Sequence, residues 1–435
     1  MGSSTAWHLS ATGLSVLLVE QQDSIYTYGS SMGDARIARS NNRGDDIWSY
    51  LHNRSVQETE ELIAYLHEQG HPDGDYKMED LYTTSPVTYV GRAAIYPGLY
   101  ASLERQKVNY KLASNLQEAM DLFGVSLKDS VLLVREYNKY SGTLNPQKLI
   151  KHLQLGAHHK GVDIRYHTKV TELTAVGNDG YRVKVQHTNT GKTQLLKARK
   201  VVSAAGPYTG KLLQGINSNI AQLINPQRVF LAYLKIKPDN YHNLSPMQKD
   251  QLLAGYPVIN SSEGGRMGSF FSMIEYFDEE GVPIIKVGGH FQRSDIQDLD
   301  KVWEEELSEE EIAFGYNNTL KYLGLNNVLI DSTDLQYIHG YSCVYSLTKT
   351  EVPYVSYIPN KEGENREDLV ALCGLSGVGA KGAMTYGLMA AKLVQQLPEK
   401  QDSMLAQIME RMGYGRLVND IEALKEERSM GHLSQ

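Results

Sequence analysis

The fold is decided by the first twenty residues of the chain, MGSSTAWHLSATGLSVLLVE (residues 1–20). Residues 3–12 (SSTAWHLSAT) predict a short helix that Gly13 ends, because glycine is the residue that most often follows a helix. Residues 15–20 (SVLLVE) form an apolar run that ends on an acid, which is typical of a parallel strand buried on both faces. Together the two segments predict the second half of a βαβ unit.

This helix–strand pair matches the end of the dinucleotide-binding fingerprint, in which G-x-G-x-x-G joins a strand to a helix and the next strand ends in Asp or Glu. Gly2 takes the place of the third glycine, and the small Ser3 continues the close approach of helix and sheet. Glu20 stands where a carboxylate accepts the hydroxyls of an adenosine ribose. The first strand and two glycines would precede Met1, so we expect a truncated unit with weakened pyrophosphate binding. An ordinary helix–strand pair is the alternative that this segment leaves open.

Beyond this start, the chain alternates between α/β and β-rich parts, which predicts an α/β (α+β mixed) fold. The segments 46–69, 145–159 and 383–397 predict helices, and an acidic helix is expected around 303–314. Expected strands are 162–167, 181–187, 201–205, 229–236, 284–288 and 369–373. We predict a discontinuous Rossmann-like FAD-binding domain formed by 1–80, 145–218 and 345–435. An inserted substrate domain with a mixed or antiparallel sheet would comprise 81–144 and 219–344.

Composition narrows the partners and the setting. The 435 residues carry a formal net charge of −8, which argues against a nucleic-acid partner. No run of 18–20 apolar residues predicts a membrane span, and no basic-then-apolar leader opens the chain. The cysteines, Cys343 and Cys373, do not make a disulfide framework, so a reducing, cytoplasmic setting is expected. No metal site is predicted, and the oligomeric state stays open, with a monomer compatible.

Four further segments spread over most of the chain carry a family resemblance: GSSMGDARIAR (29–39), IIKVGGH (284–290), CVYSLTKT (343–350) and GLSGVGAKG (374–382). In order and spacing they resemble the monomeric sarcosine oxidase and N-methyltryptophan oxidase family, which belongs to the D-amino-acid-oxidase-like FAD-dependent oxidoreductases. The resemblance implies oxidation of the C–N bond of a small amino acid, a secondary or N-methyl one. Oxygen would accept the electrons, giving an imine and hydrogen peroxide.

The resemblance also implies roles for five residues on the substrate side. Arg39 and Lys381 would clamp the substrate carboxylate, since a guanidinium offers a planar fork of donors and an ammonium a second charge. Arg36 would approach the flavin ring, and His290 and Tyr345 would line the substrate pocket. The alternatives from the residues themselves are solvated surface arginines and a histidine that only fills the core.

On the cofactor side, the resemblance places Lys286 over one flavin face, where its charge would promote oxygen reduction. An edge-strand lysine pointing to water is the alternative. Cys343 would form a covalent thioether to the flavin, whereas a free cysteine is usually a small buried hydrophobe. Val170 would contact the adenine through its backbone. Gly377 and Gly379 would let the backbone approach the flavin, together with Lys381 and Arg36.

Departures from the family pattern leave the substrate open. Ala35, Val378 and Ala380 replace a threonine, a histidine and an aromatic residue of the family, and SNN (40–42) follows Arg39. The rival hypotheses are a flavin dehydrogenase, an oxidase of glycated or cyclic amino acids, and a truncated, non-catalytic relative. A flavin domain acting on modified tRNA is a further one, against which the acidic charge balance counts.

Overall fold

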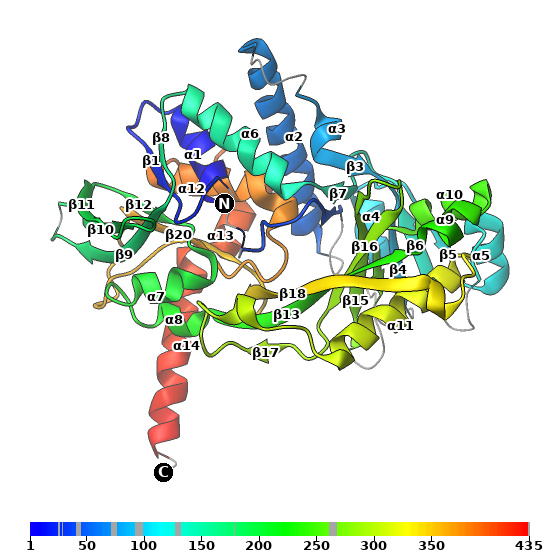
Figure 1. Ribbon diagram of the computed structural model, residues 1–435. Coiled ribbons are helices and arrows are strands. Elements are labelled where there is room, and N and C mark those ends of the chain that lie inside the picture. Colours follow the sequence, from blue (N-terminus) through cyan, green and yellow to red (C-terminus); the bar gives the residue numbers. More distant parts are fainter. Residues whose placement is uncertain are drawn as a thin grey trace.

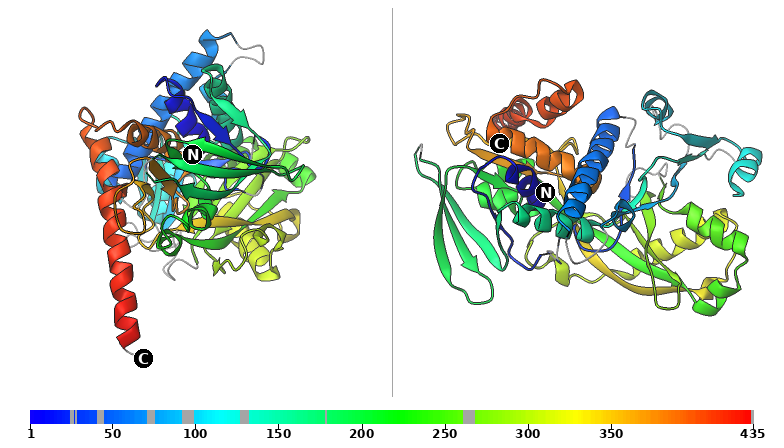
Figure 2. Two further views of the ribbon diagram at one scale, coloured as in Figure 1. Left: turned by 90° about the vertical axis from the view of Figure 1, so that its left-hand side faces the viewer. Right: turned by 90° about the horizontal axis from the view of Figure 1, so that it is seen from above.

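The computed structural model describes residues 1–24, 27, 29–40, 45–70, 76–91, 99–126, 132–177, 179–260 and 268–433. Figure 1 shows several helices gathered around the N-terminus, a small group of strands on one side of them, and a large sheet on the other. The last helix extends away from the rest of the molecule and carries the C-terminus (Figure 2). The predicted mixed α/β class is confirmed.

The first group of elements surrounds the N-terminus. Its helices are α1 (Gly2–Ser10), α2 (Asp46–Glu68), α3 (Met78–Leu81), α6 (Pro146–His159), α7 (Thr209–Leu213), α8 (Ile220–Leu223), α12 (Ala383–Gln395), α13 (Ser403–Met412) and α14 (Tyr414–Leu433). Its strands are β1 (Leu17–Val19), β2 (Arg36–Ala38), β3 (Tyr82–Thr84), β7 (Gly142–Leu144), β8 (Asp163–Arg165), β9 (Thr168–Ala175), β10 (Tyr181–His187), β11 (Thr193–Ala198), β12 (Val201–Ser203), β19 (Tyr354–Tyr357) and β20 (Leu369–Cys373).

The opening helix α1 packs tightly between α6 and α12. Small residues make this possible: a Cβ on Gly387 of α12 would lie 2.1 Å from Ser4 Oγ. On the other side, a Cβ on Gly156 of α6 would lie 2.8 Å from the Trp7 ring. Both are contacts between helices, and both depend on glycine having no side chain.

Strand β1 is less covered than its sequence predicts. It pairs in parallel with β8, while β12, β20 and β19 form a separate sheet. Within the described part of the chain, no strand pairs with the other edge of β1, and Leu17 is 38% exposed. Leu18 and Val19 are only half-buried, so the prediction of a strand buried on both faces is wrong. A Cβ on Gly2 would lie 3.4 Å from Leu18 of β1 and 3.6 Å from Ala204, which follows β12, so α1 begins close to both sheets.

Two small antiparallel sheets complete this group. Strands β9, β10 and β11 form an antiparallel meander with β10 in the centre, so the strand expected at 181–187 is present. Strands β2, β7 and β3 form the other sheet, and β2 begins at Arg36.

The large sheet has nine strands. Along one path the order is β17 (Ser294–Asp295), β13 (Asn225–Ile236), β16 (Pro283–Gly289), β15 (Phe270–Phe277), β14 (Val258–Asn260), β4 (Val87–Gly91), β6 (Leu132–Glu136) and β5 (Tyr110–Ala113), and β18 (Leu335–Leu347) pairs with β13. Accompanying helices are α4 (Leu99–Arg105), α5 (Leu116–Phe123), α9 (Pro238–Asn243), α10 (Pro246–Gly255) and α11 (Glu309–Leu325).

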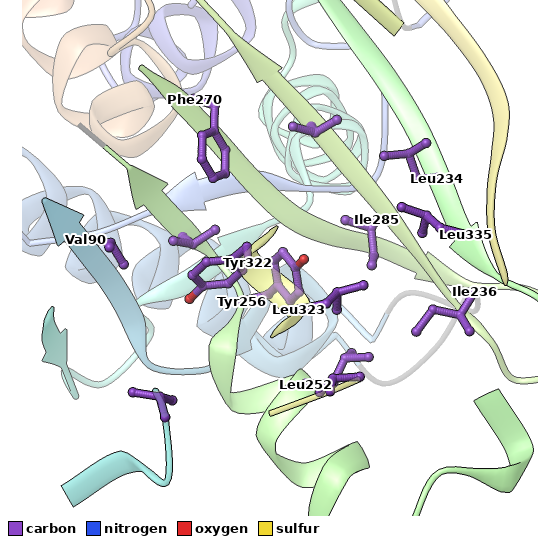
Figure 3. Packing of buried hydrophobic residues seen from close by; sticks show 14 of the residues in the cluster. Val90, Leu234, Ile236, Leu252, Tyr256, Phe270, Ile285, Tyr322, Leu323 and Leu335 are labelled. Atoms are coloured by element: carbon purple, nitrogen blue, oxygen red, sulfur yellow. The ribbon is translucent and has the colours of Figure 1, made fainter. Parts of the chain in front are cut away.

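Alternation along these strands separates two faces of the sheet. Phe230 belongs to one hydrophobic cluster of the large sheet. Leu234 and Ile285 lie in the same cluster, which also takes side chains from α10 and α11, among them Leu252 and Tyr322 (Figure 3). Successive side chains of a strand point to opposite faces, so their neighbours in sequence face the other way. Val229, Leu231, Ile284 and Cys343 form a separate cluster on that second face. This face carries the side chains considered below.

Two further comparisons with the sequence concern helices. The acidic helix expected around 303–314 is present as α11, but it begins only at Glu309, and residues Val302–Glu304 form a short 3-10 turn before it. Helix α11 begins after Ser308 because that side chain accepts from the Glu311 backbone N–H and forms a capping box. Among the described residues, no helix is both long and apolar enough to cross a membrane.

Candidate functional site

A single cavity of about 1900 Å³ runs between the N-terminal group of elements and the second face of the large sheet. This is larger than the roughly 300–1,000 Å³ of common small-ligand pockets. Every site residue predicted from the sequence lines it: Gly2, Ser3, Glu20, Arg36, Arg39, Val170, Lys286, His290, Cys343, Tyr345, Gly377, Gly379 and Lys381. Segments far apart in the chain are therefore brought to one site.

One end of the cavity is formed by α1, β1 and the meander. Glu20 follows β1 and accepts a hydrogen bond from the Gln22 backbone N–H at 3.1 Å. Burial raises the pKa of Glu20, although neighbouring backbone donors partly oppose this. Ser3 accepts from Gln154 at 3.3 Å, and Val170 lies on β9, which also lines the cavity. A carboxylate among apolar walls fits the adenosine part of a dinucleotide.

The turn after β20 brings backbone close to the other end of the cavity. Gly377 has φ +76°, and a Cβ there would lie 3.0 Å from the Tyr345 ring. Ser376 donates to the Gly374 carbonyl at 2.9 Å, which fixes the turn. A Cβ on Gly379 would lie 3.1 Å from Leu375. Glycine is thus required here both for the positive φ and for the space.

Arg36 is held by the loop that precedes β2. Its guanidinium donates to the carbonyls of Ser30 at 3.0 Å and Ala35 at 2.7 Å, and also to that of Met32. Burial opposes the charge of Arg36, but Tyr341 and other neighbours outweigh it, so the pKa of Arg36 is raised. Most of its donors are engaged with backbone. Arg36 therefore fixes this loop.

Arg39 is half-buried at the end of β2 and lies over an aromatic ring. Its guanidinium carbon is 5.6 Å from the centroid of Tyr89, a distance typical of a cation–π contact. The Tyr89 hydroxyl donates to Glu136 at 2.7 Å, and Glu136 also accepts from the Ser40 backbone N–H at 2.8 Å. Glu136 is fully buried. It supports Arg39 indirectly, because it holds the Tyr89 hydroxyl and the backbone of Ser40, the residue after Arg39.

Lys381 lies just before α12 and is buried. Its ammonium is 5.8 Å from the centre of the Trp48 ring on α2. His52, one turn further along α2, is also buried, and burial followed by the charge of Lys381 lowers the pKa of His52 to about 3. The imidazole is therefore neutral, and Lys381 is the cation of this wall of the cavity.

Lys286 lies on β16, an interior strand between β13 and β15, and its side chain is 1% exposed. The edge-strand alternative is therefore wrong. Its ammonium forms an ion pair with Glu275 and donates to the Ala35 carbonyl at 2.5 Å. Burial, followed by the nearby charge of Arg36, lowers the pKa of Lys286 to about 7, even though Glu275 opposes the shift.

Three more predicted residues sit close together on the second face of the sheet. The rings of His290 and Tyr345 meet edge to face with centroids 6.1 Å apart. Cys343 is buried, and its Sγ lies 3.9 Å from Ser30 Oγ. The other cysteine, Cys373, lies in the apolar strand β20, where burial raises the pKa of its thiol to about 12. Cys373 therefore remains a protonated core residue.

Three further residues of this region, Glu275, Tyr89 and Glu136, are not predicted from the sequence. Glu275 left a signal, since it is the acid within the apolar strand FFSMIEYF (270–277). No sequence pattern marks Tyr89 or Glu136, because their contact depends on β4 pairing with β6. Asn41 and Asn42, the departures after Arg39, lie outside the described residues. In the part of the chain that is described, no three His, Cys, Asp or Glu side chains are grouped to hold a metal ion.

Comparisons with known proteins bear on this geometry. The family model described as "DAO: FAD dependent oxidoreductase" matches residues 1–393. "Probable sarcosine oxidase" of Arabidopsis thaliana is 24% identical over 241 residues, which cover 54% of this chain and 53% of that protein. The chain thus spans about half the length of this curated relative.

Solved structures show the same fold at low identity. NikD, an unusual amino acid oxidase essential for nikkomycin biosynthesis, has a TM-score of 0.67 and 17% identity over 93% of this chain and 94% of that one. L-Proline dehydrogenase from P. horikoshii has a TM-score of 0.64 and 16% identity over 95% of this chain and 96% of that one.

Proposed function

Because this chain belongs to the FAD-dependent oxidoreductase family, we propose that it oxidises the C–N bond of a small amino acid, a secondary or N-methyl one. The observation that carries this proposal is the lining of the cavity, where Arg39 and Lys381 occur together with Lys286. Arg39 and Lys381 suit a substrate carboxylate. Lys286 lies on β16 of the large sheet. The relative named as a sarcosine oxidase and the amino acid oxidase NikD support the substrate class.

The residues that line the cavity fit FAD. In this proposal, residues 1–80, 145–218 and 345–435 bind the cofactor, and 81–144 and 219–344 bind the substrate. Gly2, Ser3, Glu20 and Val170 would hold the adenosine end, and Cys343, Gly377, Gly379 and Lys381 the flavin end. FAD supplies the acceptor for the hydride that leaves the carbon beside the substrate nitrogen. Cys343 would provide a covalent link to the ring.

The protein contributes binding and orientation. Arg39 presents its guanidinium to the substrate carboxylate, and Tyr89 beneath it limits the rotamers that it can adopt. Lys381 adds a second positive charge from the α12 side. His290 and Tyr345 form an aromatic wall, which restricts the size of the group on nitrogen or on the α-carbon. Arg36 keeps the loop 29–36 in place.

The electron acceptor has two candidates. An oxidase would use oxygen and release hydrogen peroxide, with the Lys286 ammonium stabilising the superoxide that forms first. A specific observation keeps a dehydrogenase as the second candidate: the Lys286 ammonium is already engaged by the Glu275 carboxylate and the Ala35 carbonyl. The fold does not choose between them, since both NikD and L-proline dehydrogenase share it.

The test uses the chain purified with FAD and a panel of sarcosine, N-methyl amino acids, proline and primary amino acids. Without air, a substrate should bleach the visible flavin absorbance. Under air, the same substrate should give one peroxide per turnover for an oxidase, whereas a dehydrogenase would bleach without forming peroxide. A flavin-loaded chain that no member of the panel bleaches would refute the proposed function, and a chain that binds no FAD would favour a non-catalytic relative.

A further inference from the structure

A buried acid, Glu275, sits at an irregularity of the large sheet. In the β15–β16 ladder the register shifts between Ile274 and Tyr276, and Glu275 has no partner in the register. Ile274 is opposite Ile285 and Tyr276 is opposite Ile284, so two residues of β15 span the place of one on β16. Such a bulge re-aims the side chain that it carries. Here it turns the Glu275 carboxylate toward Lys286.

The carboxylate is bound from two sides. One oxygen accepts a hydrogen bond from the Lys286 ammonium, and the other accepts a hydrogen bond from the Asp34 backbone N–H at 2.7 Å. Lys286 in turn donates to the carbonyl of Ala35, the next residue of the same loop. Gly33 makes room, because a Cβ there would lie 2.5 Å from the Glu275 carboxylate. The β15 bulge, the Glu275–Lys286 ion pair and the loop at residues 33–35 are thus connected by hydrogen bonds.

The charged and titratable neighbours of Lys286 come from four elements. Arg36 on β2 disfavours the ammonium, while Glu275 on β15 and Cys343 on β18 favour it. Tyr233 on β13 is opposite Lys286 in the register. With the side chain 1% exposed, water contributes little to holding the charge. Glu275 is therefore the main group that keeps Lys286 protonated.

We propose that Glu275 is a positioning residue that fixes both the place and the charge of Lys286, and so sets how fast the reduced enzyme transfers electrons to oxygen. Oxygen takes up two electrons and two protons and becomes hydrogen peroxide. The transfer is fastest while Lys286 is charged, because a cation stabilises the first one-electron product. This inference rests on the proposed function for its oxygen step, whereas the pairing itself is testable without FAD.

The first test follows oxygen reactivity without any substrate. The FAD-loaded chain is reduced with dithionite, and its reoxidation by oxygen is timed from pH 5 to pH 9. The wild-type rate should fall as pH rises through about 7, where Lys286 loses its proton. Glu275→Gln should move this step at least about one pH unit toward acid, since the carboxylate no longer favours the ammonium. Lys286→Gln should abolish the step and slow reoxidation on the order of 100-fold.

The second test measures the free energy of unfolding of the full chain against pH. The pKa of Lys286 is lower in the folded chain than the ordinary 10.5, so between pH 7 and 10.5 the unfolded chain binds more protons and stability rises with pH. Lys286→Gln should remove this rise, and Glu275→Gln should make it begin at lower pH. Glu275→Asp, which keeps the charge, covers the case in which the Gln variant does not fold.

Glu311→Gln is the matched control, since Glu311 is an equally buried, ion-paired carboxylate on α11 that does not line the cavity. It should leave both pH steps in place. The inference is overturned if Glu275→Gln keeps the wild-type midpoints, or if Lys286→Gln keeps either step. Failure of the proposed function looks different: no substrate bleaches the flavin, while the unfolding steps still respond to Glu275→Gln.

Discussion

At the scale of single residues, the geometry of Arg39 predicts how the substrate carboxylate is bound. A guanidinium donates two parallel hydrogen bonds to a carboxylate, and lysine keeps the charge but loses the fork. Arg39→Lys should therefore raise KM for the amino acid by about 10–100-fold, the equivalent of roughly 1.5–3 kcal/mol for a bond to a charged group. Steady-state kinetics and the Kd of a carboxylate inhibitor would measure this.

Arg182→Lys is the matched control for that substitution, since Arg182 is an exposed residue of β10 outside the cavity. Its kinetics should equal those of the wild type. An Arg39→Lys enzyme with unchanged KM and inhibitor Kd would show that the carboxylate is bound elsewhere.

The proposed thioether between Cys343 and the flavin can be tested by replacing each of the two cysteines with serine in turn. Both cysteines line the cavity, but Cys343 lies beside Ser30, whereas Cys373 lies in the buried strand β20, where burial raises the pKa of its thiol to about 12. Acid precipitation of the FAD-loaded wild type should leave a yellow pellet, since a thioether survives unfolding. Cys343→Ser should give a white pellet with free FAD in the supernatant, and Cys373→Ser a yellow one. A white wild-type pellet would disprove the thioether.

At the scale of elements, the pairing of β4 with β6 supports Arg39. This ladder sets Tyr89 opposite Val134, and the Tyr89 hydroxyl reaches Glu136 two residues further along β6. Tyr89→Phe keeps the ring under Arg39 but removes the donor to Glu136. We expect it to lower the free energy of unfolding by about 1–3 kcal/mol. KM should rise several-fold while kcat changes less, because Arg39 loses orientation.

Tyr181→Phe provides the comparison for Tyr89→Phe. Tyr181 is equally buried and donates to Asp368 at 2.7 Å, but it does not line the cavity. It should lose comparable stability with an unchanged KM. If both variants change KM equally, Tyr89 has only a structural role.

Some helices and strands can be predicted from local sequence, and others cannot. The apolar run 369–373 predicts β20 with its observed bounds, and Pro146 after Asn145 marks the start of α6. Strand β1 misleads, because an apolar run does not reveal whether other elements cover both of its faces. The bulge at Glu275 is also invisible locally, since it is defined only by the register of β15 against β16.

The same limit applies to the candidate site. Lys286, Cys343 and Tyr345 could be selected from sequence because they stand in recognisable motifs. Their common face follows from strand alternation once the strands are neighbours. Glu136 stands in no such motif, and its contact with Tyr89 depends on folding that brings residues 47 positions apart together.

At the scale of the whole molecule, two buried histidines in the helices around the N-terminus make the free energy of unfolding depend on pH. His8 on α1 lies 3.2 Å from the Met384 carbonyl of α12, and His52 lies on α2, which packs against α12. Burial is the main cause that lowers the pKa of His8 to about 4 and that of His52 to about 3. Both rings are therefore neutral in the folded chain at neutral pH.

These shifts predict loss of stability in acid. Between pH 6.5 and the folded pKa values, the unfolded chain binds more protons than the folded one, so the free energy of unfolding falls as pH falls. One such group costs about 1.4 kcal/mol per pH unit, or about 2 kcal/mol from pH 6.5 to 5. Urea unfolding should show His52→Leu losing about 2 kcal/mol less than the wild type over this interval. His67→Leu, at an exposed position of α2, should match the wild type. Equal losses in His52→Leu and the wild type would mean that His52 is already protonated in the folded chain, or that water reaches it.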